Sequence, residues 1–281
     1  MAAARRSDPL WLMAGLLTVI PLTVATAWRF RMLSRTGLNL GVASRLILSA
    51  STLNLLLPSK MGDLAKAWVL DRRYGYDPKL AFALVIFEKL LDLASLLFWG
   101  VLALIWMRPD DPVFLLGALA TAGLLGLLML LLSPWAAGTG MTMLGRHLPR
   151  KLAAMAEQWH DFTGWFWGEK LRAMNTVGLS LAIWAGHLAQ FWLYARALGS
   201  VPLIGNMAAA TLSILAGLLP FTMAGVGTRD AAIVYFYHDW LTPAQCAMLG
   251  LLATLRYVLP AIAGLPFMGD YLHRRPAPDE A

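Results

Sequence analysis

The sequence predicts an all-α polytopic membrane protein that is built from two inverted structural repeats. Hydrophobic residues make up 59% of the chain and charged residues 14%, whereas soluble domains contain roughly 45–50% and 25%. A motif with Leu-Leu-Pro also occurs in both halves, at 56–58 and 218–220. Five apolar runs are long enough to cross a hydrocarbon core of about 30 Å: 10–28, 80–107, 113–132, 177–198 and 244–268.

The basic residues indicate topology. A net charge of +7 would suggest nucleic acid as the partner of a soluble protein, but here Lys and Arg concentrate in a few connections between apolar runs. Cytoplasmic connections of membrane proteins carry such an excess. We therefore place 29–35, 60–79, 146–172 and 273–275 in the cytoplasm, and the connections 108–112 and 199–202 outside. No nucleic-acid partner is expected.

This topology makes segments 40–57 and 202–219 re-entrant helices that enter from opposite faces and turn back at Pro58 and Pro220. The repeats then cover approximately 40–107 and 202–270. The alternative is that 40–57 crosses the membrane fully, which moves the N-terminus to the inside. Duplicated hydrophobic segments broken by Pro and Gly indicate a transporter-type site at the interface between the repeats.

Two further segments have expected roles. The region 146–172 links the repeats. Its residues 149–167 place apolar side chains on one side of a helix and charged side chains largely off that side, as in an amphipathic helix at the membrane surface. We expect Trp159, Trp165 and Trp167 to form an aromatic belt there. The apolar run 10–28 is too long for a typical cleaved signal peptide, so we expect it to remain as a span.

Ionisable residues inside the run 80–107 mark the candidate site. Glu88, Lys89 and Asp92 share one wall of a helix, and Glu88 lies roughly 12 Å from the start of the run, near mid-depth. Such charges avoid lipid because each costs about 2.5–3.5 kcal/mol at the helix centre. Lys89 can neutralise both acids without any ligand, or the three can line a cavity. Since two acids and one base leave an acid over, Arg256 at similar depth is expected to pair with Glu88 or Asp92, or to hold a phosphate.

The segments after the two breaks have the composition of anion-binding helix starts. Gly225–Asp230 predicts a turn followed by a helix whose first turn carries Arg229 and Asp230. The segment 59–66 offers Lys60 and Lys66 together with Asp63. The alternative for Arg229 and Asp230 is a surface ion pair at a helix end.

Four other polar residues are possible secondary contacts. Asn54 precedes the first break, and Arg45 either extends to the membrane surface or reaches the cavity. His187 and Gln190 share a helix face, as a polar clamp or as ordinary interhelical hydrogen-bonding groups. The five His and the single Cys246 lack metal-ligand spacing, and no nucleophile or nucleotide-binding motif occurs. The sequence therefore predicts no catalytic residue, metal or cofactor.

Two blocks of this sequence resemble a known family. Residues 54–63 (Asn-Leu-Leu-Leu-Pro-Ser-Lys-Met-Gly-Asp) and 87–92 (Phe-Glu-Lys-Leu-Leu-Asp) resemble the signature of the flippase-like family, named for the transmembrane domain of bacterial lysylphosphatidylglycerol synthases. Residues 219–220 and 225–230 resemble its other block, with Asp230 where Glu is more usual. The resemblance implies a multi-pass protein of the bacterial cytoplasmic membrane that moves lipids between leaflets. The family's soluble aminoacyl-transfer domain is missing here, so synthase activity is not implied.

Two functions remain open at this point. In the first, a lipid transporter binds the phosphate of a phospholipid or isoprenoid-linked lipid through basic residues, with acids that balance charge or carry a coupling proton. In the second, a membrane enzyme or accessory subunit presents a lipid phosphate to a separate transferase. The basic candidates are Lys60, Lys66, Lys89, Arg229 and Arg256, and the acidic candidates are Asp63, Glu88, Asp92 and Asp230.

Overall fold

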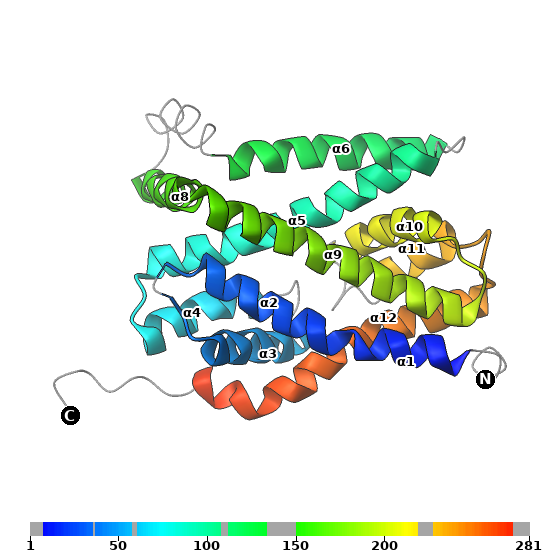
Figure 1. Ribbon diagram of the computed structural model, residues 1–281, viewed down its shortest axis with the longest axis horizontal. Helices are drawn as coiled ribbons and strands as arrows, with labels where there is room; N and C mark the ends of the chain where they lie inside the picture. Colours follow the sequence, from blue (N-terminus) through cyan, green and yellow to red (C-terminus); the bar gives the residue numbers. More distant parts are fainter. Residues whose placement is uncertain are drawn as a thin grey trace.

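The computed structural model describes residues 8–35, 37–57, 61–107, 112–133, 150–218 and 227–271. This part of the chain contains helices and no strand, which confirms the all-α prediction (Figure 1). The helices are α1 (Pro9–Leu17), α2 (Val19–Leu33), α3 (Leu40–Leu56), α4 (Gly62–Tyr74), α5 (Pro78–Met107), α6 (Pro112–Leu132), α8 (Arg150–Gly168), α9 (Lys170–Leu198), α10 (Leu203–Ala216), α11 (Thr228–Phe236), α12 (Pro243–Gly264) and the 3-10 helix η4 (Leu265–Tyr271).

Four helical segments of the described residues are long and apolar enough to cross a membrane: 9–33, 78–107, 112–132 and 243–269. Helices α9 and α10 meet at a bend of 112° and together make a fifth candidate, either as one broken span or as a re-entrant pair. These helices agree with the predicted membrane class.

The long helices begin where the sequence supplies starting residues. Pro243 opens α12, and the side chains of Thr242 and Gln245 form a capping box at its N-terminus. Pro78 opens α5, where the carboxylate of Asp77 accepts hydrogen bonds from the backbone N–H groups of Lys79 and Leu80. Proline suits the first helical position because the N–H that it lacks has no helical partner there.

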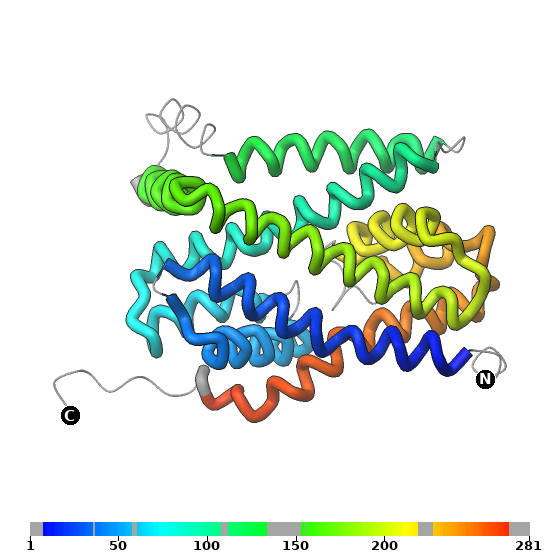
Figure 2. The backbone as a smooth tube through the Cα atoms, in the orientation of Figure 1, coloured from blue at the N-terminus to red at the C-terminus, as the bar shows by residue number. Residues whose placement is uncertain are grey.

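Helices α1 and α2 are separated only by Thr18 and follow one another along nearly one line (Figure 2). Pro21 cannot donate a hydrogen bond to the carbonyl of Leu17, which weakens the helix at this point. The nearby carbonyl of Gly15 accepts hydrogen bonds from Thr18 Oγ1 (2.6 Å), Gln190 Nε2 (3.0 Å) and Tyr194 Oη (3.2 Å). Gln190 therefore makes an interhelical hydrogen bond that fastens α9 to this break.

Two close helix contacts join the halves of the chain. Helix α3 packs along α12, and α10 packs along α5. A Cβ atom at Gly264 would lie 2.0 Å from the carbonyl oxygen of Leu48, and one at Gly100 would lie 2.4 Å from Cγ2 of Thr211. Thr52 Oγ1 also donates a 2.7 Å hydrogen bond to the carbonyl of Ala261. Small residues thus allow the backbones to approach at both contacts, as is common between membrane helices.

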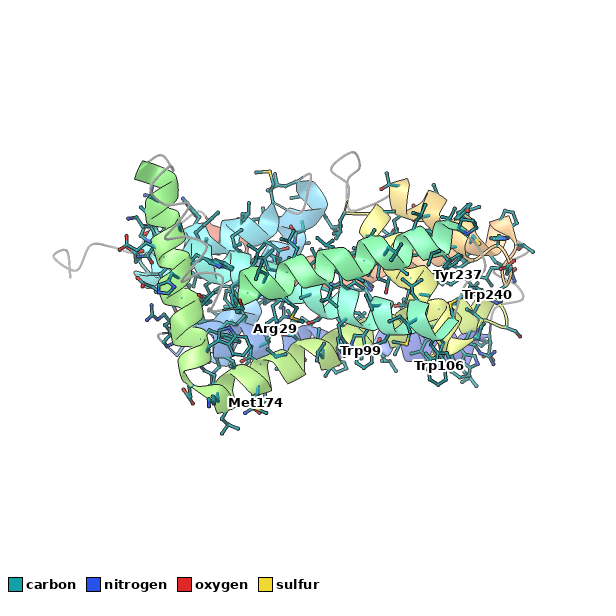
Figure 3. The ribbon with its side chains drawn as sticks, turned by 90° about the horizontal axis from the view of Figure 1, so that it is seen from above. Arg29, Trp99, Trp106, Met174, Tyr237 and Trp240 are labelled. Atoms are coloured by element: carbon teal, nitrogen blue, oxygen red, sulfur yellow. The ribbon has the colours of Figure 1, made fainter. Side chains whose placement is uncertain are left out.

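Helix α8 lies across the direction of the long helices. Figure 1 shows it nearly end-on, and Figure 3, turned by 90°, shows it nearly perpendicular to α6, beyond one end of that helix. Its buried Phe162 and Phe166 pack on Phe87 of α5, with ring centroids 5.2 and 4.6 Å away.

Two of the three predicted belt tryptophans make specific hydrogen bonds. The indole N–H groups of Trp159 and Trp167 donate to the carbonyls of Leu131 and Leu132, at 3.1 and 2.9 Å. These carbonyls belong to the last turn of α6, which has no helical donors of its own. Trp159 and Trp167 therefore cap α6, a role that the sequence did not predict.

Candidate functional site

A cavity of about 410 Å³ lies between the two halves of the chain. Helices α2, α3, α4 and α5 line it from the first half, and α9, α10 and α12 from the second. Its charged lining residues are Asp63, Glu88, Lys89, Asp92 and Arg256. Hence Glu88, Lys89, Asp92 and Arg256, which we expected to share one cavity, do line the same cavity.

Most of the remaining lining is apolar. It includes Leu22 of α2, Leu55 of α3, Leu93 and Leu96 of α5 and Ile214 of α10. Neutral polar groups lie among these side chains, namely Thr23, Thr26, Ser51, Asn54, Trp184, His187 and Gln190. The cavity therefore offers both an apolar surface and polar groups, as small-molecule sites usually do.

The acids of the cavity wall belong to an ion-pair cluster that extends behind it. Arg29 of α2 places Nη1 2.6 Å from Oδ1 of Asp92 and Nη2 3.5 Å from Oε1 of Glu88. Nη1 also lies 3.3 Å from the hydroxyl of Ser180. Arg29 and Glu88 are both fully buried (Figure 3 labels Arg29). This contact fastens α2 to α5.

Two lysines complete the cluster. The ammonium of Lys66 contacts the carboxylate of Glu88 and lies 3.3 Å from Asp63. Lys89 Nζ lies 3.2 Å from Asp63, 3.4 Å from Asp92 and 3.9 Å from Glu88. The expected neutralisation by Lys89 is therefore present, but it is shared with Lys66 and Arg29.

Sequence reasoning missed Arg29. Arg29 opens the basic run 29–35 at the end of an apolar segment, so it was interpreted as a topology signal instead of a buried residue. Its helical neighbours Ala27, Phe30 and Leu33 are all buried. The excess acid in the run 80–107 did require a further cation, and the position that supplies it is Arg29 instead of Arg256.

Arg256 is in the cavity wall but is not an ion-pair partner of these acids. The ion pairs of the described residues include Glu88 and Asp92 but not Arg256, so the expected pairing is not observed. Its side chain is 7% exposed. Nη2 donates a 2.8 Å hydrogen bond to the hydroxyl of Tyr257, whereas Nε and Nη1 have no hydrogen-bond partner in the described part of the chain.

A proline fixes the backbone next to Arg256. Pro260 lies inside α12 and lines the same cavity. Because proline has no N–H, the carbonyl of Arg256 lacks its helical hydrogen bond. Arg256 thus combines unpartnered guanidinium nitrogens with a local irregularity of its helix.

Arg229 and Asp230 stand at the start of α11, away from the cavity lining. The two residues form the ion pair at a helix end that the alternative predicted, with Asp230 partly exposed, but Arg229 is buried, with an exposed fraction of 3%. Its Nη2 donates to Asp230 (2.8 Å), to the carbonyl of Gly250 (3.0 Å) and to the hydroxyl of Thr254 (2.8 Å). Asp230 also accepts from the backbone N–H of Gly227 at 3.2 Å. These bonds fasten α11 to α12, and a contact of Arg229 with a lipid phosphate stays a prediction.

Three further candidates from the sequence are Lys60, Arg45 and Asn54. Lys60 lies outside the described residues, and Arg45 is exposed, with its guanidinium 5.7 Å from the centroid of the Phe267 ring. Asn54 connects α3 to α4, because its amide donates to Asp63 (3.1 Å) and accepts from the backbone N–H of Asp63 (3.2 Å). Among the described residues, no group of three or more His, Cys, Asp or Glu is placed to hold a metal ion.

Comparison with known proteins gives one family. The model of the family described as the lysylphosphatidylglycerol synthase TM region matches residues 1–264. No curated protein matches the chain.

Proposed function

The chain belongs to the family of lysylphosphatidylglycerol synthase transmembrane regions, and on this premise we propose that it is a lipid translocase. It moves a phosphate-bearing phospholipid or isoprenoid-linked lipid between the leaflets of the bacterial cytoplasmic membrane. The observation that carries this proposal is Arg256, whose buried and unpartnered nitrogens lie in the wall of a largely apolar cavity. Buried charges within membrane segments mark substrate pathways.

The arrangement of the helices supports the inverted repeat as part of this proposal. In it, α3, α4 and α5 correspond to α10, α11 and α12. The contact of α3 with α12 is then equivalent to that of α10 with α5. The third helix of each repeat begins at a proline, and in Figure 1 α3 and α10 lie towards opposite ends of the long axis.

Ion pairs and hydrogen bonds join the helices at and next to the cavity into two groups. Arg29, Lys66 and Lys89 tie α2, α4 and α5 together, whereas Arg229 ties α11 to α12. In a repeat-based transporter, access alternates when one such group rocks against the other around a central site. Arg256 holds the phosphate during this motion, and the apolar wall accommodates the adjoining part of the lipid.

The experiment is a leaflet-resolved assay in liposomes that contain only this protein and a fluorescent phospholipid with a phosphodiester. Reduction of the exposed dye by dithionite reports how fast lipid from the inner leaflet reaches the outside. We expect faster exchange than in protein-free liposomes, and loss of the increase in Arg256→Gln. A subunit that only presents lipid to a separate transferase binds the lipid without any increase in exchange, and that result would refute translocation.

A further inference from the structure

The charges that line the cavity suggest a preference for cations at first sight. Asp63, Glu88 and Asp92 contribute three negative charges, while Lys89 and Arg256 contribute two positive charges. Taken alone, this wall would attract a lipid whose headgroup carries an ammonium.

The residues behind the wall reverse this preference. Arg29 and Lys66 do not line the cavity, yet both are fully buried against its acids. Arg29 lies 2.6 Å from Asp92, and Lys66 lies 3.3 Å from Asp63 and contacts Glu88. With Lys89, three cations balance three carboxylates, so the cluster has no negative charge left for a cationic ligand.

Among the charged lining residues that the structure describes, Arg256 is the one outside this balance. Its Nε and Nη1 have no partner among the described residues. Tyr257 contacts the guanidinium through its hydroxyl and its ring, but neither supplies a negative charge. A buried charge without a counter-ion is unfavourable, and an anion that binds it removes that cost. One guanidinium matches one phosphodiester, and additional negative charges would meet the carboxylates of the cluster.

The neutral polar groups indicate the rest of the headgroup. His187 and Gln190 lie one turn apart on α9, interact with each other and both line the cavity. His187 Nδ1 and Gln190 Oε1 form no short hydrogen bond in the described part of the chain. An imidazole and an amide oxygen bind hydroxyl groups well, since each forms hydrogen bonds without a full charge.

From these contacts we infer that the cavity selects a lipid with one phosphodiester charge and an uncharged, hydroxyl-bearing headgroup over an aminoacylated lipid with additional ammonium groups. This inference rests on the proposed function, because it names the substrate class of the same site. The apolar lining favours a lipid over free phosphate.

The test is a native mass spectrometry titration of the full chain in detergent. The probes are phosphatidylglycerol, lysylphosphatidylglycerol, diacylglycerol and inorganic phosphate. We expect phosphatidylglycerol to bind at least about tenfold more tightly than each other probe, since hydrogen bonds to charged groups are the strong ones. Equal or tighter binding of lysylphosphatidylglycerol would overturn the inference, and equal binding of inorganic phosphate would show that the site is not specific for lipid.

Variants identify the residue responsible. Arg256→Gln should weaken phosphatidylglycerol binding about tenfold or more, to the level of diacylglycerol. Arg196→Gln is the matched control, because Arg196 lies on α9 between Trp11 and Trp192, outside the cavity lining. Unchanged binding in Arg256→Gln would refute the assignment. If Arg256→Gln does not fold, the comparison of the four probes on the unmodified chain still decides the preference.

The binding test and the exchange assay address two different claims, the substrate class and translocation. Preferential binding of phosphatidylglycerol without exchange between leaflets refutes translocation and leaves the substrate class in place. Faster exchange of lysylphosphatidylglycerol than of phosphatidylglycerol refutes the substrate class and leaves translocation in place.

Discussion

Replacing Arg29 with Met should destabilise the protein strongly. The guanidinium lies 2.6 Å from Asp92 and 3.5 Å from Glu88, and Arg29 and Glu88 are both fully buried. Met has a similar length but no charge, so the variant leaves three carboxylates with only two cations, Lys66 and Lys89. Breaking a buried ion pair by removing one partner costs about 3–5 kcal/mol. We expect a loss of that size in the free energy of unfolding.

Equilibrium unfolding of the purified protein in mixed micelles with increasing SDS measures this loss. Arg31→Met is the matched control, since Arg31 is exposed on the same helix and such substitutions change stability by about 0.5 kcal/mol or less. In a double-mutant cycle, adding Asp92→Asn to Arg29→Met should restore part of the loss, because the unpaired charge is removed. Equal stability of Arg29→Met and Arg31→Met would show that Arg29 does not hold the cluster together.

Three further substitutions separate structural from ligand-binding roles. Arg229→Gln should lower the melting temperature, because it removes charge-assisted hydrogen bonds to Gly250 and Thr254 that are worth about 1.5–3 kcal/mol each; an unchanged melting curve would contradict this structural role. Arg256→Ala should keep or raise its melting temperature in lipid-free detergent, because it breaks no ion pair and removes a buried charge that has no counter-ion, and a large decrease would indicate a structural role instead. Gly264→Val should abolish the monodisperse peak in size-exclusion chromatography, since its Cβ would lie 2.0 Å from Leu48, whereas Gly123→Val, with open space around it, should leave the peak unchanged.

The sequence was informative where a single helix determines the outcome. Apolar runs of sufficient length predicted the membrane class, and the spacing of Glu88, Lys89 and Asp92 predicted their common wall. Pro78 and Pro243 marked the starts of α5 and α12. Each of these features depends only on local residues and on the cost of charge in lipid.

Features that depend on packing between distant segments were not predictable in the same way. Arg29 and Asp92 are 63 positions apart, and a basic residue at the end of a span usually signals topology. The same reasoning led to Arg256 as the partner of the acids, although Arg29 occupies that place. The capping bonds of Trp159 and Trp167 were not predictable, because they require the end of α6 to lie beside α8; the position of these residues in an aromatic belt stays a prediction. The inverted repeat stays a prediction.

The central claim is that a lipid phosphate binds at Arg256, and a solid-state NMR measurement tests it most directly. The protein is labelled with ¹⁵N-arginine and reconstituted with phosphatidylglycerol, and the dipolar coupling between guanidinium nitrogen and lipid phosphorus is recorded. We expect a short nitrogen–phosphorus contact in the unmodified protein, and its loss in Arg256→Gln but not in Arg196→Gln. Absence of the contact, or the same contact in Arg256→Gln, would contradict the claim.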